Sequence, residues 1–94
     1  MITNPHAALF VVEKPAELSS AQERNWPSLL AELQTLAKRT EGSERPNETL
    51  VLIPLKNGLP TLTRLCAEAE KHEFGYRVLF LAEGHTWFRS DATI

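Results

Sequence analysis

The stretch Ala7-Ala8-Leu9-Phe10-Val11-Val12 decides the fold class of this chain. It is a continuous apolar run, without alternation of apolar and polar residues, and such runs are typical of strands buried on both faces. Pro15 limits the run on its carboxyl side. Two similar apolar runs follow at 49–55 and 76–82, so the sequence predicts three buried strands.

The chain between the first two runs predicts a helix over 26–40. Ser20 and Glu23 match a capping box, but Pro27 inside a helix would remove a hydrogen bond at a cost of about 3 kcal/mol. Either residues 20–25 form a separate turn, or one long helix kinks at Pro27. The apolar stripe favours the separate turn, because its members at helical spacing are Trp26, Leu29, Leu30, Leu33, Leu36 and Ala37.

A second helix is predicted over 60–73. Pro60 falls near its first position, where the missing N–H costs nothing, and Gly75 follows its last turn. Between the first helix and the second strand, residues 41–48 contain no apolar side chain. We expect this segment to be a mobile, solvated loop.

The carboxyl end of the chain predicts a hairpin. Glu83-Gly84-His85 is typical of a tight turn, and Thr86-Trp87-Phe88-Arg89 of a short fourth strand paired with the third. We therefore expect one small α/β domain over 1–94, in the order β-α-β-α-β-β, with frayed ends at 1–6 and 91–94.

Right-handed crossovers would make the first three strands parallel, and the hairpin would add an antiparallel edge. The expected fold is a four-stranded, mostly parallel sheet with two main helices. Because the first two strands are apolar on both faces, strand order 2-1-3-4, with one helix on each face, is preferred over 1-2-3-4.

The expected sheet is too wide for its helices. Four strands span roughly 19 Å, whereas one helix is about 10 Å across, so apolar sheet surface should remain uncovered. Contiguous exposed apolar surface marks interfaces. The sequence therefore predicts a homodimer or another protein partner.

Composition narrows the class of protein. The 94 residues carry 10 Lys+Arg against 12 Asp+Glu, with one cysteine, Cys66. A disulfide framework and a Cys-rich zinc site are excluded, and the charge balance shows no basic footprint for nucleic acid. No apolar run is long enough for a membrane span or a secretory signal. We expect a cytoplasmic protein without a membrane or nucleic-acid partner, and no motif indicates a cofactor.

One anion site is suggested at the end of the second strand. Lys56, Asn57 and Gly58 form a glycine-containing turn that leads into a helix N-terminus, and Thr61 could complete the site. The stretch has neither the repeated glycines of a dinucleotide loop nor the Gly-Lys-Ser/Thr of a phosphate loop, so a plain turn is the stronger interpretation.

The predicted hairpin supplies further candidates. Glu83 and His85 could titrate as a pair, and Trp87, Phe88 and Arg89 could join an interface. No catalytic constellation and no metal site is predicted.

Two further features of the second helix are interpreted as structural. Glu68 and His72 lie four residues apart on one helix face, which favours an ordinary surface pair. Cys66 lies on the apolar stripe of that helix, which favours a buried core thiol.

These observations favour a small non-enzymatic α/β protein that acts through protein–protein contacts at its apolar sheet surface. The alternative is a small-anion or nucleotide-binding domain, or an enzyme, that uses the strand ends around Lys56-Asn57-Gly58 and Glu83/His85.

Overall fold

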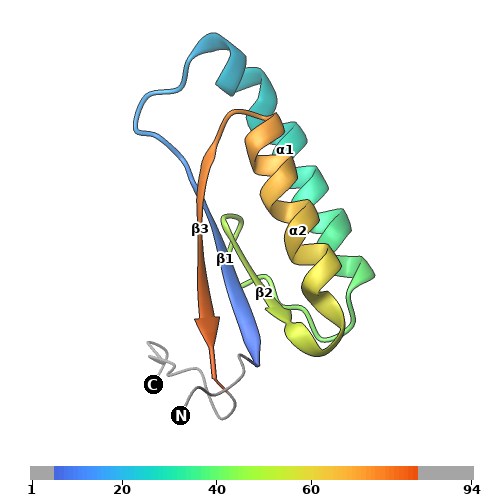
Figure 1. Ribbon diagram of the computed structural model, residues 1–94. Coiled ribbons are helices and arrows are strands. Elements are labelled where there is room, and N and C mark those ends of the chain that lie inside the picture. The colour runs from blue at the N-terminus through green and yellow to red at the C-terminus, as the bar shows by residue number, and fades with distance from the viewer. Residues whose placement is uncertain (1–5, 83–94) are drawn as a thin grey trace, which may run out of the picture.

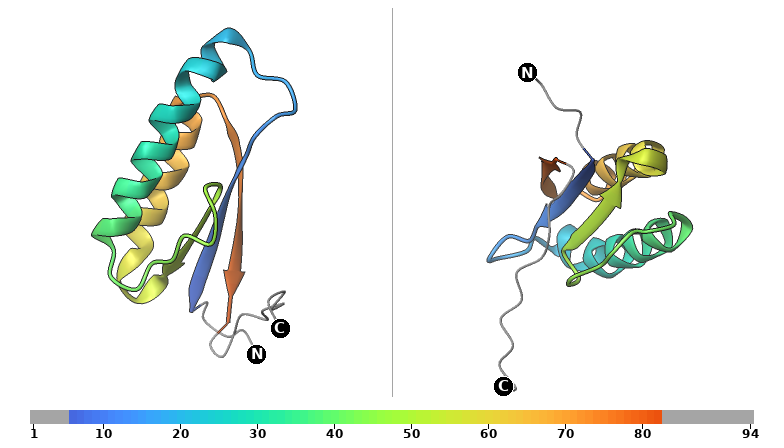
Figure 2. Two further views of the ribbon diagram at one scale, coloured as in Figure 1. Left: turned by 180° about the vertical axis from the view of Figure 1, so that it is seen from behind. Right: turned by 90° about the horizontal axis from the view of Figure 1, so that it is seen from below.

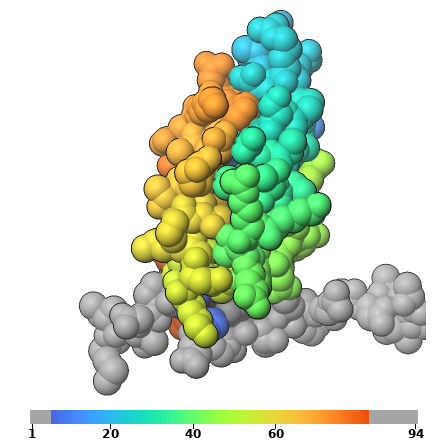
Figure 3. All heavy atoms as spheres, turned by 90° about the vertical axis from the view of Figure 1, so that its right-hand side faces the viewer, coloured from blue at the N-terminus to red at the C-terminus, as the bar shows by residue number. Residues whose placement is uncertain are grey.

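The computed structural model describes residues 6–82. Five elements follow one another in that range: β1 (Ala7–Glu13), α1 (Ser20–Arg39), β2 (Leu50–Pro54), α2 (Leu55–Lys71) and β3 (Gly75–Leu81). The strands form one sheet, and both helices lie on the same face of it (Figures 1 and 2). Figure 3 shows the two helices side by side over that face. Neither helix in the described range is both long and apolar enough to cross a membrane.

The sheet has strand order β2-β1-β3, and both outer strands run antiparallel to β1. Leu9 in β1 lies opposite Leu52 on one side and Leu79 on the other. The expectation of a four-stranded, mostly parallel sheet with a helix on each face is therefore wrong. The expected fourth strand, Thr86-Trp87-Phe88-Arg89, lies outside the described residues.

Residues 40–49 explain why β2 is antiparallel. The helix α1 returns the chain towards the start of β1 (Figure 1), from where a parallel strand would follow directly. Residues 40–49 instead run back along β2, and Glu44 and Leu52 exchange backbone hydrogen bonds of 3.0 and 2.8 Å. Arg45 stabilises this reversal of chain direction, because its Nε donates a hydrogen bond to the carbonyl oxygen of Leu50 at 3.1 Å. The strand β2 consequently enters the sheet from the opposite end.

The first helix starts at Ser20 and contains Pro27. The preferred expectation, a separate turn before a helix over 26–40, is wrong, and one long helix forms. Its cap lies one residue earlier than Ser20: the Ser19 hydroxyl accepts from the Gln22 N–H at 3.1 Å, and the Ser19 N–H donates to Oε1 of Gln22 at 3.0 Å. Such a cap stabilises a helix by about 1 kcal/mol. This gain offsets part of the free-energy cost of the backbone hydrogen bond that is lost at Pro27.

The second helix starts at Leu55, directly after β2, and not at position 60 as expected. The turn expected at 56–58 is the first turn of the helix. Gly58 is buried there, and a Cβ at this position would overlap Cγ2 of Ile53. The glycine is needed because the helix lies so close to β2.

The core lies between the sheet and the two helices. In β1, alternate side chains point at the helices, and Phe10 and Val12 in this set are almost fully buried. They pack with Val51 and Ile53 of β2 and with the apolar stripes of both helices. The Trp26 ring meets Phe74 edge to face, with centroids 5.0 Å apart, at the end of α2. These contacts fix both helices over β1 and β2.

The close approach at Gly58 gives a testable expectation. A Gly58→Ala substitution would gain about 1 kcal/mol in helix propensity, but the added methyl group overlaps the buried Ile53 side chain. We expect the overlap to dominate and the free energy of unfolding in urea to fall by about 2 kcal/mol.

Gly75→Ala is the matched control. Its Cβ would lie 3.4 Å from Oε1 of Glu13, an ordinary contact at an exposed position. The free energy of unfolding of this variant should be unchanged or about 0.5 kcal/mol higher. Equal stability of the two variants would contradict the close packing of α2 on β2.

Candidate interaction surface

The strand β3 carries apolar side chains on both faces and leaves part of each face exposed. From its register with β1, Tyr76, Val78 and Phe80 point to the helix side, whereas Leu79 and Leu81 point to the opposite side. Phe80 is 54% exposed and Leu79 is 57% exposed. A strand of this composition is ordinarily buried on both faces, so the exposure needs an explanation.

The outer backbone edge of β3 is also unpaired within residues 6–82. Along an antiparallel strand, successive residues direct their N–H and C=O groups to alternate sides. Val12 donates to the Thr49 carbonyl at 3.0 Å, on the β2 side, so its neighbour Val11 faces β3. Val11 lies opposite Arg77. The groups of Tyr76, Val78 and Phe80 therefore point away from β1, to the outer edge.

A groove of about 530 Å³ runs between α2 and β3. It exists because α2 packs over β1 and β2, and β3 lies at the margin of the sheet (Figure 2, right). Its floor is the helix-side surface of β3 and its wall is one face of α2. The lining residues are Leu62, Thr63, Cys66, Ala67, Glu70, Val78 and Phe80. We define the β3 surface as this groove together with the outer edge of β3, Leu79 and Leu81.

One polar contact links the two sides of the groove. The Tyr76 hydroxyl donates to Oε1 of Glu70 at 3.2 Å, and this bond raises the pKa of Tyr76. Burial raises the pKa of the Cys66 thiol, the Tyr76 hydroxyl lowers it, and the Glu70 carboxylate raises it again. The thiol is half-buried at the groove and not a fully buried core residue. With its raised pKa it stays protonated at neutral pH and is a poor nucleophile.

The one charged residue of β3, Arg77, forms an ion pair with Glu13 of the neighbouring strand β1. Nη2 of Arg77 lies 3.0 Å from Oε2 of Glu13, and Nε donates to the same oxygen at 3.1 Å. Both side chains are largely exposed, so the pair adds little stability. Its effect is electrostatic, because it neutralises the one charge of the strand β3 itself, whereas the Glu70 carboxylate remains in the lining of the groove.

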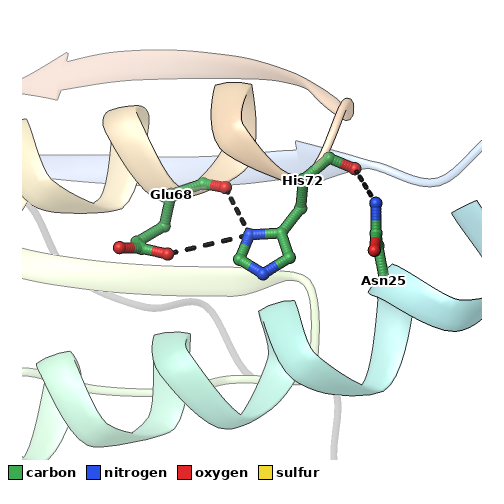
Figure 4. Close-up of polar contacts among 3 residues, drawn as sticks. All are labelled: Asn25, Glu68 and His72. Carbon is green, nitrogen blue, oxygen red and sulfur yellow. Dashed lines mark hydrogen bonds and ion pairs between the residues drawn. The ribbon is translucent and has the colours of Figure 1, made fainter. Parts of the chain in front are cut away.

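A second polar cluster joins the two helices at the end of α2 (Figure 4). The side chains of Glu68 and His72 are each only 13% exposed, so the expectation of a surface pair is wrong. Nδ1 of His72 lies 2.7 Å from the Glu68 carbonyl oxygen and 3.7 Å from its Oε2. Asn25 of α1 donates from Nδ2 to the His72 carbonyl at 3.3 Å.

This cluster closes the end of α2. The amide of Gln22 also donates to the Glu73 carbonyl, at 3.0 Å, so two side chains of α1 satisfy carbonyls at this helix end. Oε2 of Glu68 is buried and accepts no hydrogen bond from the residues that the structure describes. Across residues 6–82, no three metal-ligating side chains lie together.

The residues of the predicted anion site mostly serve the packing of α2. Gly58 contacts β2, and the Thr61 hydroxyl is hydrogen-bonded to the hydroxyl of Thr40. Asn57 donates from Nδ2 to the Glu41 carbonyl at 3.4 Å. Lys56 is exposed. Anion binding at this place stays a prediction.

The other predicted site residues, Glu83, His85, Trp87, Phe88 and Arg89, lie outside the described residues. Comparison of the chain with protein-family models gives no match. The comparisons with curated protein sequences and with solved structures also give none.

The effect of the groove on the pKa of Cys66 can be tested by alkylation of this thiol. We expect the alkylation of Cys66 by iodoacetamide to rise with pH around a midpoint above the ordinary pKa of cysteine, because burial disfavours the thiolate. Glu70→Gln should lower the midpoint, since the nearby negative charge is lost. Tyr76→Phe should raise it, since the hydroxyl no longer stabilises the thiolate.

The opposite direction of the two shifts is the control, because a general loosening of the groove would move both variants the same way. A midpoint at or below that of a free cysteine peptide would contradict the burial of the thiol.

Proposed function

We propose that this chain is a non-enzymatic α/β module that binds another protein chain through the β3 surface. The observation that carries the proposal is the coincidence, on one strand, of a backbone edge unpaired within residues 6–82 and exposed apolar side chains on both faces. Each feature alone is common on protein surfaces. Together they form the kind of template that extended chains join by strand addition.

The way proteins protect unused edges supports this interpretation. Edge strands that bind nothing are typically short, or carry lysine, proline or inward-pointing charges. β3 has seven residues, and its sequence, GYRVLFL, contains neither lysine nor proline. Its one charge is paired with Glu13. Protein binding explains why such an edge is left without these protective features.

The groove supports the same function. An added strand would direct every second side chain into the space between α2 and β3, where Val78, Phe80 and Leu62 offer apolar contact. The polar groups there suit a binding surface better than catalysis, because the Cys66 thiol is held protonated by burial. A bound chain would cover both faces of β3 at once.

Site-specific photo-crosslinking tests the proposal. A photo-reactive amino acid replaces Leu79 in cells that express the chain from its own gene, and adducts are identified by mass spectrometry. We expect one reproducible protein adduct at position 79. The same amino acid at Lys38, exposed on α1, should give none.

A second substitution then shows whether the β3 surface is responsible. Phe80→Glu should reduce the adduct at least about tenfold, since it places a charge in the apolar contact. Leu59→Glu is the matched control, because Leu59 is 58% exposed and lies outside the groove lining. Circular dichroism checks that both variants are folded. Absence of any adduct at position 79, or equal loss in both variants, would refute the proposal.

A further inference from the structure

We infer that the chain bound at the β3 surface is a second copy of this protein, with the two β3 strands paired antiparallel about a two-fold axis at Val78. This inference rests on the proposed function and names its partner. The result is a continuous six-stranded sheet with four helices on one face. Charge, backbone direction and the position of the groove each support this pairing.

Charge makes β3 compatible with its own copy. A two-fold interface brings the same surface to both sides, so an unpaired charge at its centre would face a like charge. The one charged side chain of β3, Arg77, already has Glu13 of the same protomer at 3.0 Å. The strand itself therefore presents no unpaired charge to its copy, so a second apolar strand would fit along this edge.

Backbone direction restricts the register. Hydrogen bonds across the edge must join the outward-pointing residues Tyr76, Val78 and Phe80 to one another. An axis at Val78, the middle residue of Gly75–Leu81, places Val78 opposite its own copy and Tyr76 opposite Phe80 of the second copy. All seven residues of the strand are then in register.

The neighbouring registers are worse. An axis at Arg77 would place the two Arg77 side chains directly opposite each other, which is destabilising. An axis at Leu79 would leave Gly75 and Tyr76 beyond the far end of the partner strand. Only the axis at Val78 uses the whole strand and sets each Arg77 beside Leu79 of the second copy, where its aliphatic stem can pack.

The two grooves meet in this arrangement. Because the axis is perpendicular to the sheet, both pairs of helices lie on the same face, and the two α2 helices flank one shared channel. Phe80 of each copy lies next to Tyr76 of the other, which forms two cross-strand aromatic pairs over the channel floor. Glu70 is bonded to Tyr76 at one end of each groove, so the axis separates the two carboxylates.

Disulfide trapping tests the register. In a Cys66→Ser background, Val78→Cys places two cysteines directly opposite each other, with Cα atoms about 5.5 Å apart, within the range of a disulfide. Phe80→Cys is the matched control on the same strand and face. Its copy lies about 14 Å away along the strand.

Sedimentation of the 94-residue wild-type chain, at concentrations from low to several hundred micromolar, gives the oligomeric state. We expect a dimer, a disulfide-linked species after mild oxidation of the Val78→Cys protein, and at least about tenfold less of it from the Phe80→Cys protein. Phe80→Glu, made in the otherwise wild-type chain, should convert the dimer to a monomer, whereas Leu59→Glu should leave the dimer intact. Circular dichroism verifies that each variant is folded.

Other results would overturn the inference. A dimer in which Phe80→Cys crosslinks as well as Val78→Cys refutes the register. A monomer at every concentration refutes the second copy, while a photo-adduct at position 79 with a different protein would leave the proposed function standing. A monomer with the Val78 amide protected from hydrogen exchange would show that the edge is covered within a single chain, which also refutes the second copy.

Discussion

The burial of β1 between two antiparallel neighbours is the constraint on which the rest of the structure depends. Its helix-side residues, among them Phe10 and Val12, form the floor of the core, and both outer strands take their register from it. Two helices on one face suffice to cover β1 and β2. They do not reach across β3, because α2 is held against β2 at Gly58. The exposed strand is thus a consequence of where the core is packed most tightly.

Apolar runs predicted the three strands, and apolar stripes at helical spacing predicted the two helices. The direction of β2, however, depends on polar residues in the segment before it. The segment 41–48 has the composition of a solvated loop, yet Glu44 pairs with β2 and Arg45 binds the Leu50 carbonyl. These polar contacts form only once β2 is in place, so local sequence does not reveal them. The helix starts were missed for a related reason: tertiary packing at Gly58 and the Ser19 cap outweigh the penalties of Pro60 and Pro27.

The sequence predicted that apolar sheet surface would be left uncovered, but it did not predict that this surface would lie on β3. A shortage of helical cover follows from chain length and strand composition alone. The run at 76–82, however, has the same composition as a buried strand, and the individual residues predicted for an interface were Trp87, Phe88 and Arg89. A useful signal was available in Arg77, because a charge within an otherwise apolar run favours a strand with one face near solvent. Similarly, spacing alone could not show that Glu68 and His72 lie largely buried between the two helices (Figure 4).

The way α2 is fixed at its two ends has a kinetic consequence. Its first turn is wedged against β2 at Gly58, and carbonyls at its last turn receive the amides of Gln22 and Asn25 from α1. The helix α2, which forms the wall of the groove, therefore cannot move relative to the sheet without breaking the contacts at one of its ends. A surface held in this way is preorganised, so docking of the proposed partner would cost little conformational entropy and would proceed as a rigid-body encounter. Association should then be limited by orientation rather than by a preceding structural rearrangement.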